Sequence, residues 1–221
     1  IEDLWSSSNQ ADIVLITPDG YWDILEQMVE HYSRLDPPLR AARIRLSEIY
    51  NRFAGGLDDP IAMRNLLMYS YDKPWMTAPD YVVFCGDGDY NYRNIDRPEL
   101  ENFVPPFESE STAYCTDDWF VDFDQNNSAS IIPQIPNGRL TATNSYELQA
   151  MIDKIISYTE DPEFGAWRNN MTLVADDEFG TNSIRERSHV TVQEEIARDY
   201  LPQSSEITKI YLTEYERGVG R

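Results

Sequence analysis

Carboxylate side chains follow two apolar segments of the sequence, at positions where binding and catalytic groups are often found. Asp87 and Asp89 come directly after the β-rich run Tyr81–Cys85, and Asp176 follows a second such run at 171–175. Open parallel sheets place their sites beyond the carboxyl ends of strands. If neighbouring strands bring these three carboxylates together, they could hold a metal ion for a hydrolase or act as acid and base. The alternative is that they are acidic turns that only end strands.

A second acidic group lies in a proline-rich insertion at 91–136, where four aspartates alternate with aromatic residues: Asp117, Asp118, Asp122 and Asp124. Carboxylate oxygens are the ligands that Ca²⁺ prefers, so a loop that folds back on itself could bind a structural calcium ion. The spacing does not fit an EF-hand loop. A solvated acidic loop is the alternative interpretation.

The sequence offers few candidates for a nucleophile and its base, because it has two cysteines and two histidines. Cys85 lies in an expected central strand, where a small buried thiol is typical, and Cys115 stands among carboxylates, which disfavour the thiolate. His31 is expected at the surface or partly buried on a helix. His189 precedes a helix and could act as a base only with a thiol beside it. We therefore expect no complete active site within this chain.

Charge and motif content exclude several classes of protein. The chain has 39 acidic and 18 basic residues, a net charge of -21, which disfavours binding to nucleic acid or anionic membranes and favours cations. It contains no dinucleotide fingerprint, Walker loop, hydrolase elbow or zinc-binding His-Glu-x-x-His. No apolar run approaches the ~20 residues that span a bilayer, so no membrane insertion is expected.

The expected elements alternate strand, loop and helix, which predicts an α/β fold with a mainly parallel, doubly wound sheet and an acidic loop insertion. Apolar patterns predict strands at 13–17, 41–46, 81–85, 171–175 and 207–212, and helices at 21–35, 60–71, 144–158 and 192–201. Segment 51–57 is expected to be a loop. Asp59 and Asn144 are expected to cap helices, the latter in a capping box with Glu147.

Composition also predicts the domain organisation. Residues 1–10 are polar and serine-rich and are expected to form a lead-in peptide with Trp5 as an anchor. Residues 11–160 are expected to form a first α/β subdomain. After a boundary near 161–165, the segment 167–221 is expected to open a second subdomain with a βαβ unit.

Several stretches, taken in order, resemble one family. They include Ile-Tyr-Asn-Arg-Phe at 49–53, Asp-Pro-Ile-Ala-Met-Arg-Asn at 59–65 and Val-Phe-Cys-Gly-Asp-Gly-Asp-Tyr at 83–90. Further blocks at 116–120 and 138–142 continue the similarity. Together they resemble the gingipain-type cysteine peptidases, and most closely the sub-group that acts as the sortase of the type IX secretion system.

The resemblance implies a caspase-like pair of α/β subdomains, with a catalytic His in a Gly-His-Gly turn and a nucleophilic Cys on a following strand. Both would come after a strand like 207–212. This sequence contains no Gly-His-Gly, and neither Cys85 nor Cys115 matches the nucleophile's context. The resemblance thus implies a peptidase segment without its dyad, inactive alone. Its full-length parent would cleave peptides or process secreted proteins, outside the cell or at the outer membrane.

The resemblance also implies roles for individual residues. Asp177 or Glu178 falls near the family's acidic residue beside the catalytic His, and His189 falls near a residue that lines the specificity pocket. The family binds structural calcium, which favours calcium at the aspartates of the insertion. The competing hypothesis is a non-catalytic, calcium-stabilised binding or scaffold domain of a surface protein.

Overall fold

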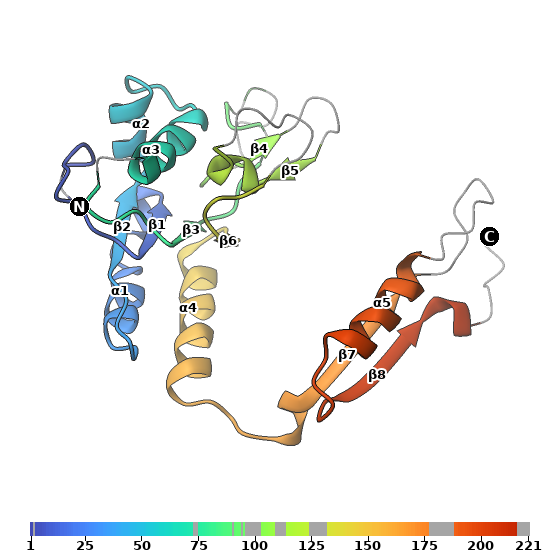
Figure 1. Cartoon of the computed structure of the whole chain (residues 1–221). Coiled ribbons are helices and arrows are strands. Elements are labelled where there is room, and N and C mark those ends of the chain that lie inside the picture. The colour runs from blue at the N-terminus through green and yellow to red at the C-terminus, as the bar shows by residue number, and fades with distance from the viewer. Residues whose placement is uncertain are drawn as a thin grey trace. The chain divides into compact units, whose positions relative to one another are not determined.

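The computed structural model describes residues 1, 3–72, 75–89, 91–93, 95, 103–108, 114–123, 132–176 and 188–215. The chain divides into two compact units, Ile1–Asp161 and Pro162–Arg221 (Figure 1).

The first unit is built on a four-stranded parallel sheet. Its strands, in spatial order, are β2 (Ala41–Arg45), β1 (Ile13–Thr17), β3 (Tyr81–Cys85) and β6 (Asn137–Leu140). All five residues of β1 are buried, as expected for a strand with neighbours on both edges and cover on both faces. The predicted α/β fold with a mainly parallel sheet is confirmed, and β3 is central as predicted.

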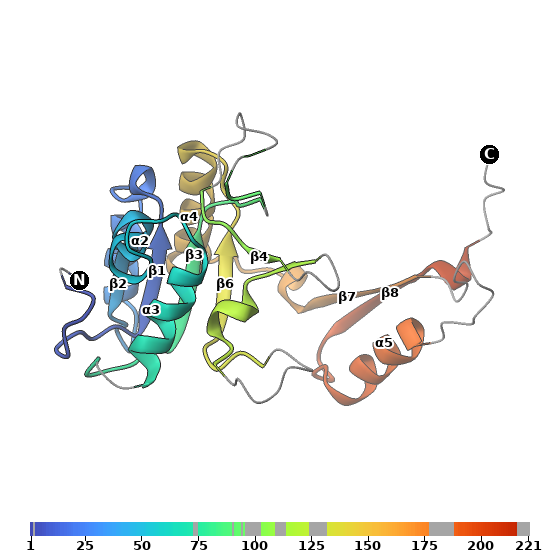
Figure 2. The same cartoon turned by 90° about the horizontal axis from the view of Figure 1, so that it is seen from above.

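Helices cover both faces of this sheet. On one face lie α2 (Leu46–Phe53) and α3 (Ile61–Asp72), packed with Val14, Ile16 and Phe84, and on the other lie α1 (Glu26–Ser33) and α4 (Ser145–Glu160), packed with Ile13, Leu15 and Cys85. Figure 2 shows α3 and α4 on opposite sides of β3. The division follows from the alternation of side chains along a strand. The sheet is therefore doubly wound.

Several predicted boundaries are wrong. The second strand ends at Arg45, and the segment predicted as a loop at 51–57 begins inside α2, whose residues Leu46, Ile49 and Tyr50 are buried. The spacing of these three buried residues is typical of a helix. The alternation of Ile44 and Leu46 just before them indicated a strand instead, and this hid the start of the helix. The first helix is shorter than predicted, because a 3₁₀ turn (Asp19–Tyr21) precedes it.

The predicted helix caps are present. Asp59 Oδ1 accepts a hydrogen bond of 3.0 Å from the amide of Ile61. Asn144 Oδ1 accepts from the amides of Tyr146 (3.1 Å) and Glu147 (3.0 Å), which satisfies donors that the helix leaves free. The Glu147 carboxylate accepts from the amide of Thr143, one residue before the cap, in place of the usual reciprocal bond to the cap itself.

The amino-terminal segment packs against the first unit. Leu4 is fully buried, and its carbonyl accepts a 2.9 Å hydrogen bond from the indole nitrogen of Trp75. The ring of Trp5 stacks on Phe53 with centroids 4.4 Å apart. Leu4 therefore anchors this segment more deeply than Trp5, which is partly exposed.

The second unit is a βαβ arrangement, with parallel strands β7 (Asn170–Ala175) and β8 (Glu206–Tyr211) and helix α5 (Ser188–Asp199). Short 3₁₀ turns lie at Ala166–Asn169 and Leu212–Glu214. One face carries the small core, formed by Leu173, Ala175 and Tyr211 with α5. On the other face, Val174 and Ile210 are exposed among the described residues.

The described part of the insertion holds a two-residue antiparallel pair, β4 (Phe107–Glu108) and β5 (Cys115–Thr116), followed by a 3₁₀ turn at Asp118–Val121. Phe120 and Val121 are buried and belong to the core on the α2 and α3 face. The insertion is therefore anchored to the sheet by its aromatic and aliphatic residues.

Candidate functional site

The carboxyl edge of the first sheet is the position where this fold builds sites. The chain leaves β1 toward β2 on one side and then crosses to β3 on the other, so the strand order reverses beside β1. In open parallel sheets, ligands bind in the crevice beyond the carboxyl ends of the strands at such a reversal.

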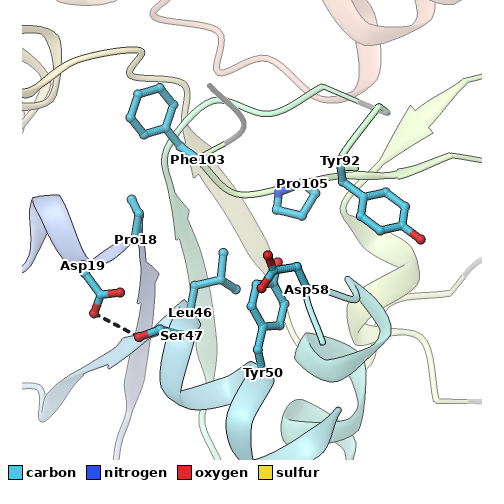
Figure 3. Close-up of a pocket in the computed structure, with 9 residues that line it drawn as sticks. All are labelled: Pro18, Asp19, Leu46, Ser47, Tyr50, Asp58, Tyr92, Phe103 and Pro105. Atoms are coloured by element: carbon cyan, nitrogen blue, oxygen red, sulfur yellow. Dashed lines mark hydrogen bonds between the residues drawn. The ribbon is translucent and has the colours of Figure 1, made fainter. Parts of the chain in front are cut away.

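A pocket of about 300 Å³ lies at this edge (Figure 3). Its floor and one side come from Pro18 and Asp19, which follow β1, and from Ser47 and Tyr50 on α2. Asp58, just before α3, lies above the Tyr50 ring in Figure 3.

The opposite wall comes from the chain that follows β3. It presents Phe103 and Pro105 with Tyr92 beside them (Figure 3). Phe103 stacks on Tyr21, with ring centroids 5.2 Å apart and planes 11° from parallel. The wall opposite the acidic groups is therefore apolar and aromatic.

Two carboxylates face the pocket, and they differ in their hydrogen-bond and ion-pair partners. Asp19 Oδ1 accepts a 3.0 Å hydrogen bond from the hydroxyl of Ser47 and lies 3.3 Å from Nε of Arg45. Asp58 is exposed and has no ion pair or hydrogen bond to its side chain within the described residues. The uncompensated charge of the pocket is therefore at Asp58.

Tyr50 supplies a hydroxyl to the same pocket. The residue is only 8% exposed, and Figure 3 shows its hydroxyl end directed toward Asp58. Within the described part of the chain this hydroxyl has no hydrogen-bond partner. Burial, followed by the charges of Asp58 and Asp59, raises the pKa of Tyr50 above its ordinary value of 10.0, so the phenol stays protonated.

Asp87 and Asp89 lie at the end of β3 as predicted, where a crossing segment packs on them. The amide of Val104 donates a 2.9 Å hydrogen bond to the carbonyl of Asp87. A Cβ at Gly88 would lie 2.1 Å from the Val104 carbonyl oxygen, so only glycine permits this approach. Asp176 belongs to the second unit, and the three-carboxylate metal site therefore stays a prediction.

Arg139, on β6, forms hydrogen bonds with three segments at this edge of the sheet. Its guanidinium bonds both carboxylate oxygens of Asp117, at 2.8 and 2.6 Å, and donates to the carbonyls of Gly86 (2.8 Å) and Val104 (2.6 Å). The two side chains are 12% and 18% exposed. Sequence reasoning missed this residue because its partners are far away along the chain.

The predicted calcium ligands have the following positions. The Asp117 carboxylate forms an ion pair with Arg139. Asp118 is exposed and accepts a 2.9 Å hydrogen bond from Asn137. Asp122 is buried, and Asp124 lies outside the described residues. Within the described ranges, no group of three acidic, histidine or cysteine side chains is placed to hold a metal ion. Calcium therefore stays a prediction.

Neither thiol has the surroundings of a nucleophile. Cys85 is fully buried and unpaired with Cys115, and burial raises its pKa to about 12. Cys115 is exposed, but partial desolvation, followed by the carboxylates of Glu108 and Asp89, raises its pKa as well. A raised pKa lowers the fraction of thiolate, which is the reactive form.

The prediction that His31 lies at the surface or is partly buried is wrong. The residue is buried between α1 and α4, with Nδ1 3.0 Å from Oε1 of Glu160 and Nε2 3.1 Å from the hydroxyl of Thr159. A polar pair on the facing helix makes this burial possible. His31 thus joins two helices.

His189 is the second residue of α5 and is exposed. The role in substrate binding that the resemblance implies for it stays a prediction. Asp177 and Glu178, the expected supporting acids, lie outside the described residues.

Comparison with known proteins places the chain in a family. The model of peptidase family C25 matches residues 6–220. No curated protein matches the chain. Among the described residues, no helix has the length and apolarity to cross a bilayer.

A solved structure shows the same fold. The crystal structure of dimeric latent PorU from Porphyromonas gingivalis is similar with a TM-score of 0.59 and 23% sequence identity, over 73% of this chain and 17% of that chain. The present chain therefore spans less than a fifth of the PorU chain. Since the family match covers nearly all of the sequence, the chain belongs to peptidase family C25, the family of gingipain-type cysteine peptidases.

Proposed function

We propose that this chain is a segment of the catalytic domain of a gingipain-like cysteine endopeptidase and that it is inactive by itself. The parent protein would hydrolyse peptide bonds or process secreted proteins in the manner of a sortase, outside the cell or at its surface. Membership of peptidase family C25 over residues 6–220 supports the reaction class.

The observation that carries the proposal is the state of the two thiols. A cysteine peptidase needs a thiolate beside a base, so that the sulfur attacks the peptide carbonyl and forms an acyl-enzyme. Cys85 is sealed in the core with a pKa of about 12, and the pKa of Cys115 is also raised by its surroundings. His31, the base candidate in the first unit, is engaged by Glu160 and Thr159.

Exposed apolar residues on the second unit, among the residues that the structure describes, also support a larger domain. Val174 is 61% exposed and Ile210 is 39% exposed, and the two are paired in register on the face away from α5. Parallel sheets normally have both faces covered, and a two-stranded sheet is marginal alone. Further strands and a helix of the same catalytic domain would supply this cover.

A peptidase assay tests the proposal. The purified 221-residue protein, incubated with a mixed fluorogenic peptide library with and without a thiol alkylating agent, should show no thiol-sensitive cleavage. Cys85→Ser and Cys115→Ser serve as a matched pair. If cleavage appears and either substitution abolishes it, the nucleophile lies within this chain and the proposal is wrong.

The gene itself offers an independent test. The proposal expects the coding sequence beyond Arg221 to encode a Gly-His-Gly turn followed by a strand with a cysteine. A parent gene without these features would favour the alternative, a non-catalytic binding or scaffold domain.

A further inference from the structure

We propose that the pocket at the carboxyl ends of β1 and β2 is a binding site for a small organic cation, an ammonium or guanidinium group carried on a short apolar body. The inference does not rest on the proposed peptidase function, because neither cysteine nor histidine lines this pocket.

Place and size agree with a ligand site. The pocket lies at the reversal of strand order, where open parallel sheets bind ligands. Its volume of about 300 Å³ is at the lower end of the range for small-molecule sites. A compact ligand is therefore expected.

Asp58 determines the sign of the ligand's charge. The Asp19 carboxylate is already bonded to Ser47 and lies beside Arg45, so it adds little free charge. Asp58 has neither kind of partner in the described part of the chain and faces the pocket (Figure 3). The whole chain carries a net charge of -21, which also attracts cations and repels anions.

Tyr50 provides a second polar group that a ligand in this pocket could bond. The residue is 8% exposed, its hydroxyl is directed into the pocket, and that hydroxyl has no hydrogen-bond partner within the described residues. The buried side-chain oxygens without a partner in the described residues do not include this one, so the hydroxyl oxygen is accessible from the pocket and free to bond a ligand. An ammonium group has three donors, so it can bond the Asp58 carboxylate and the Tyr50 oxygen together.

The opposite wall suits the rest of such a ligand. Phe103 and Pro105 offer an apolar surface, and the pocket lining also includes the aromatic residue Tyr92 (Figure 3). Aromatic faces attract cations, and alkyl carbons bury well against proline and phenylalanine. A neutral ligand of the same shape would leave the Asp58 charge unpaired.

Binding of simple probes tests the proposal. Butylammonium and butylguanidinium are titrated into the isotopically labelled protein, with butylurea as the neutral analogue and butyrate as the anion. The cations should shift the signals of Tyr50, Tyr92 and Phe103, and butylurea should bind at least about tenfold more weakly, because it lacks the charged hydrogen bond. Butyrate should not bind.

Three variants locate the site. Asp58→Asn should weaken cation binding about tenfold or more, and Tyr50→Phe, which keeps the ring, should weaken it several-fold. Asp23→Asn changes the net charge by the same amount at an exposed position outside the pocket and should leave binding unchanged. Because Asp58 is exposed, its substitution is compatible with folding, which the amide spectrum verifies.

The same titration separates two sources of the cation. Binding of N-acetyl-lysine methylamide as tightly as butylammonium would indicate the side chain of a polypeptide, and its rejection would indicate a free amine. The proposal is overturned if neither cation binds at concentrations up to about 10 mM, if butylurea binds equally well, or if Asp58→Asn binds like Asp23→Asn.

Discussion

Replacing Arg139 with methionine should destabilise the first unit more than the loss of any exposed ion pair. The substitution removes two hydrogen bonds to Asp117 and two to the carbonyls of Gly86 and Val104. It also leaves the 18%-exposed Asp117 carboxylate without its cation. Breaking a buried pair costs about 3–5 kcal/mol, and this pair is slightly exposed, so we expect a loss of about 3 kcal/mol.

The measurement is urea unfolding followed by tryptophan fluorescence, to which the first unit contributes four of the chain's five tryptophans. Arg34→Met is the matched control, because Arg34 is 56% exposed and its pairs with Glu30 and Glu160 should contribute less than about 1 kcal/mol. Arg139→Lys should lose about 1–2 kcal/mol, since one ammonium cannot reproduce the guanidinium fork.

A double-mutant cycle isolates the pair itself. Arg139→Met combined with Asp117→Asn should be less destabilised than the sum of the two single variants by about 1–3 kcal/mol, because the double variant leaves no unpaired charge. The reasoning is refuted if Arg139→Met loses no more stability than Arg34→Met, or if the two single effects simply add.

Three further predictions concern thiols, pH and calcium. With an aromatic disulfide reagent at pH 8, the native protein should react at Cys115 only, and the urea-unfolded protein should react at both cysteines. The reason is that Cys85 is buried and that burial raises its pKa to about 12. Fast reaction of Cys85 in the native protein would contradict its burial. Hydrogen bonds from Thr143 lower the pKa of Glu147 below 4.5, so its stabilising effect should be complete above that pH and disappear as the pH falls through the lowered value. The melting temperatures of the wild type and Glu147→Gln should therefore differ at pH 6 and converge near pH 3, and a constant gap would count against this linkage. Added CaCl₂ should raise the melting temperature and a chelator reverse it, if calcium binds the native insertion. Asp118→Asn should abolish this shift, whereas Asp117→Asn is a poor test because it also loses the bond to Arg139.

Local signals in the sequence predicted the elements whose cause is local. The apolar run of β3, the proline and aspartate before α3, and the asparagine cap of α4 each act within a few residues, and all three are present. The start of α2 was missed because Leu46 fits both the strand before it and the helix after it. Short apolar runs do not by themselves distinguish the two periods.

Groups that depend on long-range contacts were not predictable in this way. Arg139 bonds partners 22, 35 and 53 positions away, and no pattern around it indicates them. The burial of His31 depends on Glu160, 129 positions later. The pocket likewise joins residues near Pro18, Tyr50 and Phe103, which only the folded sheet brings together.

The anchoring of Leu4 changes where the first unit can be shortened. A truncated protein that begins at Ala11 would leave a void where Leu4 lies and deprive the Trp75 indole of its acceptor, in a position that water does not reach. Removing a buried leucine side chain alone typically costs about 2–5 kcal/mol. The polar, serine-rich stretch expected as a lead-in peptide thus contributes a buried side chain to the first unit, and proteolytic trimming past Leu4 should weaken the sheet that it packs on.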